Sequence, residues 1–244
     1  MIGSTIYRIA QTYSTNNYAA TQLLTNSPPD GSVIITDSQI DGRGQGVAKW
    51  ESESGRNLTF SIVLYPDFLE VSNQFELSKV ISLGVVDFLS AFTPDVSIKW
   101  PNDIYIGNGK VAGILIENSI RINKISSSII GIGLNINQQL FKGDAPNPVS
   151  LGQITQKSYD LDELLSQLCE KIDFRYRQLA AKEILKIDTD YAAILYRRDL
   201  WAHYSDENGD FEGRILGVDQ IGRLQIETRL GKINRYQFKE VTFK

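Results

Sequence analysis

Two residue types that supply many catalytic and metal-binding side chains are almost absent from this chain. Its 244 residues include a single histidine, His203, and a single cysteine, Cys169. An internal disulfide and a zinc site built from histidine and cysteine are therefore excluded, and a Cys-His dyad is not expected. His203 precedes a polar turn and is expected at the surface, whereas Cys169 lies in an apolar-periodic segment and is expected to be buried. An enzyme of this composition would act by positioning and electrostatics rather than through its own nucleophile.

Long apolar runs and an excess of positive charge are also missing. No apolar run approaches the ~20 residues needed to cross a bilayer, and the N-terminus lacks the features of a signal peptide. The formal net charge of −4 argues against binding to nucleic acids or membrane surfaces. With 42% hydrophobic and 22% charged residues, the sequence predicts a cytoplasmic globular protein with one sizeable core and a smaller module.

The most informative stretch is residues 99–117, which sets charged and amide side chains against two apolar runs. Both runs are rich in β-branched and aromatic residues, and Asn108-Gly109 between them supplies the positive φ of a tight turn, so a β-hairpin is expected. Gly113 interrupts the second run. A glycine inside a buried strand indicates either a bulge or a place where a ligand or another backbone comes close.

Four polar side chains stand at the ends of these strands: Lys99, Asn102, Asp103 and Lys110. From these positions they can reach a shared cleft. Each of them alone is most simply a solvated side chain, and only the cluster favours a functional site.

A glycine-rich loop is expected upstream, over residues 37–50. Three glycines alternate between positions 42 and 46, and Arg43 and Lys49 add positive charge. Because glycines let the backbone approach an anion and present its N–H groups, the loop suits an anionic ligand, although such a loop can also be a plain turn. Neither standard nucleotide fingerprint occurs: Val47 stands where a dinucleotide-binding motif has its third glycine, and no Gly-x-x-x-x-Gly-Lys-Ser/Thr is present.

Hydrophobic periodicity and turn residues predict the other elements. Strands are expected over 33–36, 58–65, 96–100, 104–106, 111–116 and 126–137, and helices over 18–24, 73–92, 161–179 and 184–197, the last broken near Asp188. Ser14 before the first helix is either a simple N-cap or a functional residue, and Asn135 either closes a turn or recognises a polar ligand. From Trp201 onward, short strands predict a small antiparallel barrel and thus domains over 1–197 and 198–244.

Taken in order, these motifs resemble the biotin protein ligase family. The resemblance is carried by Ser14-Thr15-Asn16, Gln39 through Trp50, Lys99-Trp100-Pro101-Asn102-Asp103, Lys110-Val111-Ala112-Gly113-Ile114-Leu115 and Gly133-Leu134-Asn135. It implies an α+β fold of the class II aminoacyl-tRNA-synthetase/biotin-ligase type: a mixed β-sheet with packed helices, followed by a small C-terminal β-barrel resembling a Src-homology-3 domain.

The resemblance also implies a two-step reaction. Biotin, the substrate, and ATP with Mg²⁺ would form biotinyl-5′-AMP and pyrophosphate. The mixed anhydride would then acylate a lysine of a biotin carboxyl carrier domain. Such chemistry suits a site without nucleophilic side chains, because the biotin carboxylate itself attacks the α-phosphate.

Site residues follow from the same resemblance. Biotin contacts are implied for Ser14, Thr15, Asn16, Gln39, Gly42, Arg43, Trp50, Lys110 and Gly113, and ATP contacts for Arg43, Gly44, Lys49, Trp50, Asn102, Lys110 and Asn135. Catalytic roles are implied for Lys110, Asp103 and Arg43. Lys110 would polarise the biotinyl carbonyl and the α-phosphate, whereas Asp103 would orient a lysine, carry magnesium or assist the acceptor amine.

The chain departs from the family pattern in its glycine-rich loop. Many members carry several arginines here, whereas residues 45–48 read Gln-Gly-Val-Ala and leave fewer cations near the phosphates. This difference bears on retention of the adenylate and on dimerisation through the loop, so a monomer or weak homodimer is expected. The N-terminal DNA-binding domain of bifunctional members is also absent from this sequence, which predicts a ligase with no nucleic-acid partner.

Two alternatives remain open at this stage. A lipoate or octanoate ligase on the same scaffold would share a lysine like Lys110 but should carry an arginine-plus-triple-glycine loop with a histidine, which this chain lacks. A noncatalytic sensor of biotin or its adenylate would have less need of both Lys110 and Asp103.

Overall fold

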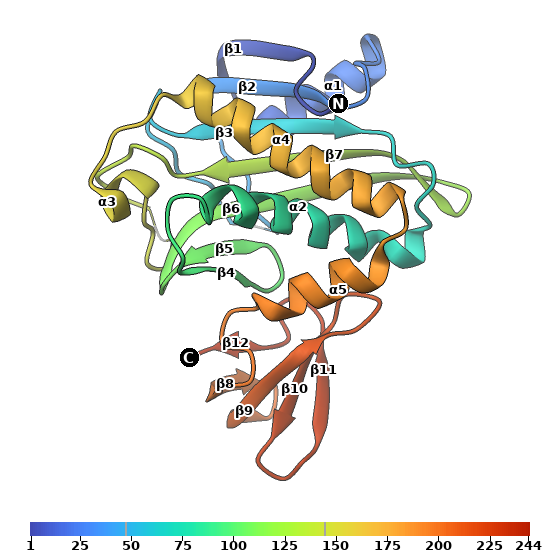
Figure 1. The fold of residues 1–244 in the computed structure, drawn as a ribbon, viewed down its shortest axis with the longest axis vertical. Helices are drawn as coiled ribbons and strands as arrows, with labels where there is room; N and C mark the ends of the chain where they lie inside the picture. Colours follow the sequence, from blue (N-terminus) through green and yellow to red (C-terminus); the bar gives the residue numbers. More distant parts are fainter. Residues whose placement is uncertain (47, 144) are drawn as a thin grey trace.

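The computed structural model describes residues 1–46, 48–143 and 145–244 and confirms the predicted α+β architecture. Its larger part is a seven-stranded sheet in the order β1-β2-β3-β7-β6-β5-β4 (Figure 1). The strands are β1 (Ile6–Thr12), β2 (Ser32–Gln39), β3 (Leu58–Leu64), β4 (Val96–Lys99), β5 (Asp103–Ile106), β6 (Gly109–Arg121) and β7 (Lys124–Leu134). β1 runs parallel to β2 and the other neighbours are antiparallel, so the sheet is mixed, as predicted. Val47, which breaks the dinucleotide-binding pattern, lies outside the described residues.

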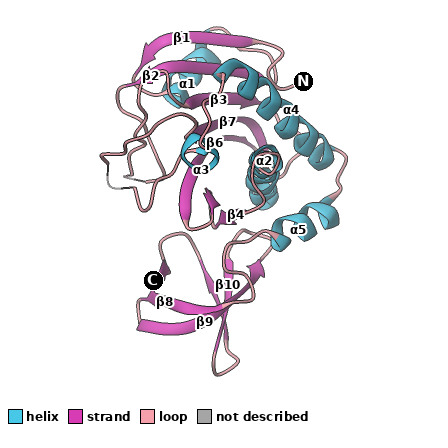
Figure 2. Cartoon of the chain, turned by 60° about the vertical axis from the view of Figure 1, so that its left-hand side comes forward, coloured by secondary structure: helices cyan, strands magenta, loops and turns pink. Residues whose placement is uncertain are grey.

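Helices cover both faces of this sheet (Figure 2). They are α1 (Thr15–Thr25), α2 (Gln74–Leu89), α3 (Leu151–Thr155), α4 (Leu161–Ala180) and α5 (Ile184–Ala193), with a short 3-10 helix η1 (Val71–Asn73). Because successive strand residues point to opposite faces, Val33 and Ile35 enter the main core beneath α2 and α4, whereas Ile34 packs with Ala19 of α1.

α2 and α4 approach each other closely at Gly84. A Cβ atom on Gly84 would lie 2.7 Å from the Cα and 2.9 Å from the Cγ1 of Ile172 on α4. The absence of a side chain at Gly84 therefore permits the close packing of these two helices.

We expect Gly84→Ala to lower the free energy of unfolding by about 2 kcal/mol, because the new methyl group forces two packed helices apart. Helix propensity alone predicts the opposite sign, since alanine favours a helix by about 1 kcal/mol over glycine. Denaturant unfolding followed by circular dichroism measures the change. Equal or greater stability of the variant would show that α2 and α4 can separate without cost.

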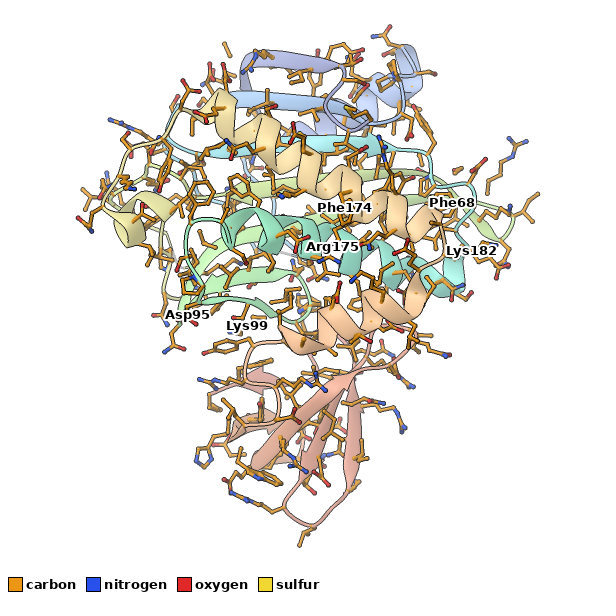
Figure 3. The ribbon with its side chains drawn as sticks, viewed as in Figure 1. Phe68, Asp95, Lys99, Phe174, Arg175 and Lys182 are labelled. Atoms are coloured by element: carbon orange, nitrogen blue, oxygen red, sulfur yellow. The ribbon has the colours of Figure 1, made fainter. Side chains whose placement is uncertain are left out.

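A partly buried arginine, Arg175 on α4, connects three helices and is labelled in Figure 3. Its guanidinium donates to Asp87 on α2 at 2.5 Å and to Asp190 on α5 at 2.6 Å. These hydrogen bonds and the negative charges of both carboxylates raise the pKa of the Arg175 guanidinium above its ordinary value. The network fixes α5, the helix from which the chain passes to the C-terminal sheet.

The C-terminal module is an antiparallel five-stranded sheet below α5 in Figure 1. Its strands are β8 (Trp201–Asp206), β9 (Gly209–Val218), β10 (Leu224–Thr228), β11 (Ile233–Tyr236) and β12 (Thr242–Phe243), in the order β11-β10-β9-β8-β12. The predicted small barrel is thus present as a barrel-like sheet, but among the described residues its outer strands do not pair to close it. The exact domain boundary at residues 197 and 198 stays a prediction.

The turn of the β5–β6 hairpin differs from its prediction. Positive φ occurs at Gly107, at 57°, and not at Asn108-Gly109, because strand β6 already begins at Gly109. The irregularity in pairing lies at Val111, two positions before Gly113 on β6. Gly113 itself pairs regularly with Asp103 and Gly133. Gly113 is therefore a site of close approach rather than a bulge.

Two helix predictions also need correction. α5 ends at Ala193 and continues through Asp188 without a break. The short helix α3 was not predicted, although Ser150 and Gln153 form the capping box that stabilises its first turn.

Burial agrees with the remaining sequence expectations. Cys169 is 4% exposed, and burial raises the pKa of its thiol to about 12. His203 is exposed. In the described part of the chain, no helix is both long and apolar enough to cross a membrane.

Candidate functional site

One cleft of about 590 Å³ gathers most of the predicted site residues. It lies at the start of α1, along the middle of β6 and β7, beneath the glycine-rich loop, and beside the end of the C-terminal sheet. The predicted residues that line it are Ser14, Thr15, Asn16, Gln39, Arg43, Gly44, Lys49, Trp50, Asn102, Asp103, Lys110 and Gly113. Segments from opposite ends of the sequence thus meet at a single concave surface.

One end of the cleft is a buried hydrogen-bonding group at the start of α1. The Thr15 backbone N–H donates to Gln39 Oε1 at 2.9 Å, and Ser61 Oγ lies 2.8 Å from Thr15 Oγ1 and 2.7 Å from Asn16 Oδ1. Ser14 occupies the N-cap position without making a side-chain capping hydrogen bond, which leaves its hydroxyl available for a ligand. Fixed donors and acceptors of this kind suit a rigid polar ring.

Ser61 is a member of this group that the sequence analysis missed. It is fully buried in β3, within an apolar strand. A hydroxyl in such a strand was the available signal, because buried polar groups need a partner.

Arg43 is held at the edge of the cleft by acceptors from two distant elements. Its guanidinium donates to Glu117 Oε1 at 2.6 Å and also to Asn17 Oδ1. Glu117 in turn accepts from Asn16 Nδ2 at 2.7 Å. Glu117 was not predicted as a site residue, yet it connects the glycine-rich loop to the start of α1. Lys49 on the same loop pairs with Asp41 at 2.9 Å.

The ring of Trp50 packs against two strand glycines. A Cβ atom on Gly133 would lie 2.1 Å from the Trp50 ring, and one on Gly113 would lie 3.1 Å from it. The indole Nε1 is buried and has no hydrogen-bond partner among the described residues. The two glycines therefore make room for an aromatic ring, which forms an apolar wall of the cleft.

Lys110 and Asp103 form a short ion pair inside the cleft. Lys110 Nζ lies 2.6 Å from Asp103 Oδ1, and the two side chains are 17% and 22% exposed. The amine also lies 5.9 Å from the centroid of the Trp50 ring. Partial burial strengthens the electrostatic interactions of the Lys110 amine relative to those of a surface lysine, because less water screens its charge. Of the three roles predicted for Asp103, the geometry favours orientation of a lysine.

The described residues of the cleft offer few ligands for a magnesium ion. Among the described residues no three His, Cys, Asp or Glu side chains gather as a metal site. Asp103 offers one carboxylate already paired with Lys110. Because Mg²⁺ is commonly held by one or two carboxylates together with substrate phosphates, Asp103 as its ligand stays a prediction.

Lys99 also lines the cleft but was not included among the predicted ligand contacts. Its amine donates to the Tyr105 hydroxyl at 3.1 Å and lies 5.0 Å from the Tyr105 ring centroid and 5.1 Å from that of Phe243. Burial lowers the pKa of Lys99 from its ordinary value, although nearby Asp103 opposes the shift. Its position at the start of the Lys99–Asp103 motif was the signal that could have identified it.

Three other predicted residues have structural partners. Asn102 lines the cleft while its amide donates to the Ile114 carbonyl at 2.8 Å. Asn135 does not line it, and its amide donates to the Val149 carbonyl at 3.1 Å. Gly42 packs beneath the backbone of Trp50 and is also outside the lining. Ligand contacts by these residues stay predictions.

Residues 8–135, which supply most of the cleft, match the family model described as the biotin/lipoate A/B protein ligase family. The chain belongs to this family. Among its relatives, the bifunctional ligase/repressor BirA of Bacillus spizizenii is 30% identical over 224 residues, which are 89% of this chain and 68% of BirA. The biotin--acetyl-CoA-carboxylase ligase of Paracoccus denitrificans is 32% identical over 82% of this chain and 85% of its own length.

Solved structures of the family extend the likeness to the whole fold. The biotin protein ligase from Aquifex aeolicus, in complex with biotin and ATP, superposes with a TM-score of 0.82 at 26% identity. The match covers 99% of each chain, so both the large sheet and the C-terminal module belong to the shared architecture.

Proposed function

We propose that this protein is an ATP-dependent biotin protein ligase that forms biotinyl-5′-AMP and transfers biotin to a lysine of a biotin carboxyl carrier domain. The proposal is carried by the Lys110–Asp103 ion pair, which lies in the same cleft as the buried polar group at the start of α1. The Aquifex aeolicus structure with biotin and ATP and the Paracoccus denitrificans carboxylase ligase support the choice of substrates.

Adenylation requires charge stabilisation more than a protein nucleophile. An oxygen of the biotin carboxylate attacks the α-phosphate, the bond between the α-phosphate and its bridging oxygen breaks, and pyrophosphate leaves with that electron pair. Lys110 supplies positive charge where negative charge develops on the α-phosphate. Asp103 holds the Lys110 amine in place at 2.6 Å. Magnesium, when bound with ATP, would neutralise further phosphate charge.

Transfer uses the same cation. The carrier lysine amine attacks the biotinyl carbonyl, an amide bond forms, and AMP leaves with the electrons of the broken anhydride bond as the amine loses its proton. Lys110 polarises the carbonyl in this step. The ring of Trp50 and the buried polar group at α1 hold the acyl chain and the ring system of biotin, so that the reacting atoms meet in one geometry.

Labelling of a purified biotin carboxyl carrier domain tests the proposal. With ATP and Mg²⁺ we expect incorporation of biotin, seen by mass spectrometry as a biotinyl group on one lysine. Lipoate and octanoate serve as alternative acyl donors, with a lipoyl domain as their acceptor. Labelling by these acids in place of biotin would assign the other branch of the family, and binding of biotin without any transfer would indicate a sensor.

The cytoplasmic location and the monomeric or weakly dimeric state belong to the same proposal. Size-exclusion chromatography with light scattering, with and without biotin and ATP, measures the oligomeric state directly.

A further inference from the structure

A lysine of the C-terminal module reaches the glycine-rich loop of the large domain. Lys239 lines the same cleft as Lys110, together with Phe238 and Phe243 from its own module. Its amine lies so close to the loop that a Cβ atom on Gly46 would be 2.7 Å from Lys239 Nζ. The C-terminal module therefore brings a positive charge to a loop that has glutamine and glycine at positions 45 and 46.

The backbone of Lys239 is in an unfavourable conformation for a lysine. Its φ is 70°, at the third position of the turn that the Glu240 N–H closes on the Gln237 carbonyl at 3.1 Å. Glycine or asparagine is preferred at such a position because a larger side chain crowds the backbone. Since Lys239 is exposed, burial in a core does not compensate for this strain. Strain of this kind is commonly retained where a side chain has a function.

Among the described residues, the Lys239 amine lies 5.6 Å from the centroid of the Phe238 ring but has no carboxylate partner. Arg43, Lys49 and Lys110 in the same cleft each pair with a carboxylate. Within the described ranges, by contrast, no carboxylate oxygen lies within 4.0 Å of the Lys239 amine. A lysine amine that no described carboxylate neutralises, held against a glycine whose backbone permits close approach, suits a multiply charged anion.

We propose that Lys239 binds the β- and γ-phosphates of ATP and the pyrophosphate that leaves. It thereby adds a cation from the C-terminal module to Arg43 and Lys49 of the glycine-rich loop, both of which are already paired with carboxylates. This inference rests on the proposed function for the identity of the nucleotide. It assigns polyphosphate binding to the part of the cleft where Lys239 approaches the glycine-rich loop. The nucleotide site then includes residues of both modules. Neutralising the leaving group is the chemical contribution, because negative charge grows on pyrophosphate as its bond to the α-phosphate breaks.

Lys239→Gly separates this role from a structural one. Glycine suits the positive φ, so the variant should fold with an unfolding temperature equal to or above that of the wild type. Its affinities for ATP and for inorganic pyrophosphate, measured by calorimetry, should fall about tenfold, as expected for loss of one charge-assisted contact. Biotin affinity measured without nucleotide should not change. Lys239→Arg, which keeps the charge, should retain most of the pyrophosphate affinity.

Lys182→Gly is the matched control. Lys182 is another exposed lysine with positive φ, 60°, and it lies at the opposite side of the molecule from the cleft residue Lys99 (Figure 3). This variant removes the same charge from the same backbone conformation and should leave both phosphate affinities at the wild-type value.

Unchanged pyrophosphate affinity in Lys239→Gly, or an equal loss in Lys182→Gly, would overturn the inference. An equal loss of biotin affinity would do so as well, because it would indicate general damage to the cleft. Failure of the wild-type protein to activate biotin would instead refute the proposed function, and the pyrophosphate titration would still decide the role of Lys239.

Discussion

Lys110→Ala should reduce the rates of both biotin adenylation and biotin transfer by about a hundredfold to a thousandfold, the range for loss of one preorganised charge at a reacting centre. Biotin affinity without nucleotide should change by less than about threefold, because the amine acts on charge that exists mainly in the transition state. Single-turnover kinetics measure the two rates, and calorimetry measures the affinity. The ion pair with Asp103, at 2.6 Å, places this amine within the cleft before any ligand arrives.

Two further variants sharpen this result. Asp103→Asn keeps the shape of the side chain but removes the charge that orients Lys110, so it should lower the same rates by a smaller factor. Lys171→Ala removes an exposed lysine of α4 and should change nothing. Equal losses of rate and biotin affinity in Lys110→Ala would contradict its role in the transition state and assign it to binding alone.

Gly133→Ala should abolish most biotin binding while the protein stays folded. The added methyl group would lie 2.1 Å from the Trp50 ring, far inside van der Waals contact, so the ring must leave its place. Overpacking of this kind typically costs about 1–3 kcal/mol, which corresponds to a loss of biotin affinity of roughly fivefold to 160-fold if the displaced ring blocks the cleft. Titration calorimetry and near-ultraviolet circular dichroism follow the affinity and the environment of the indole.

Gly113→Ala provides a graded comparison on the neighbouring strand. Its methyl group would lie 3.1 Å from the same ring, a distance that a shift of a few tenths of an ångström relieves. Biotin affinity should therefore fall much less than in Gly133→Ala. Similar losses in both variants would show that the spacing between these glycines and Trp50 does not control the cleft.

The fold was largely predictable because its hydrophobic patterns are regular. The buried α2 and the apolar strands β3 and β7 follow clear helical and strand periodicity, and Asp160 marks the start of α4 by accepting hydrogen bonds from the next turn. The errors lie where geometry depends on a few backbone angles. Nothing local distinguishes Gly107 from Gly109 as the residue of positive φ, and α3 is too short for its periodicity to be recognised.

The site was predictable where residues of one motif stay together and less so where distant segments meet. Lys110 and Asp103 can be recognised from the sequence alone, because each stands within a short continuous motif. Ser61 and Glu117 support the cleft only through tertiary contacts with Asn16 at the start of α1, which no sequence spacing reveals. The same holds for Lys239, because its approach to Gly46 depends on how the C-terminal module docks on the large domain.

Biotin-dependent exchange between ATP and labelled pyrophosphate is the sharpest test of biotin activation by this protein, since it reports adenylate formation without any carrier protein. The purified wild-type protein should incorporate label into ATP when biotin is present and should show only background exchange with lipoate, octanoate or no acid. Exchange supported by lipoate or octanoate but not by biotin, or no exchange with any of these acids, would show that the protein does not form biotinyl-5′-AMP.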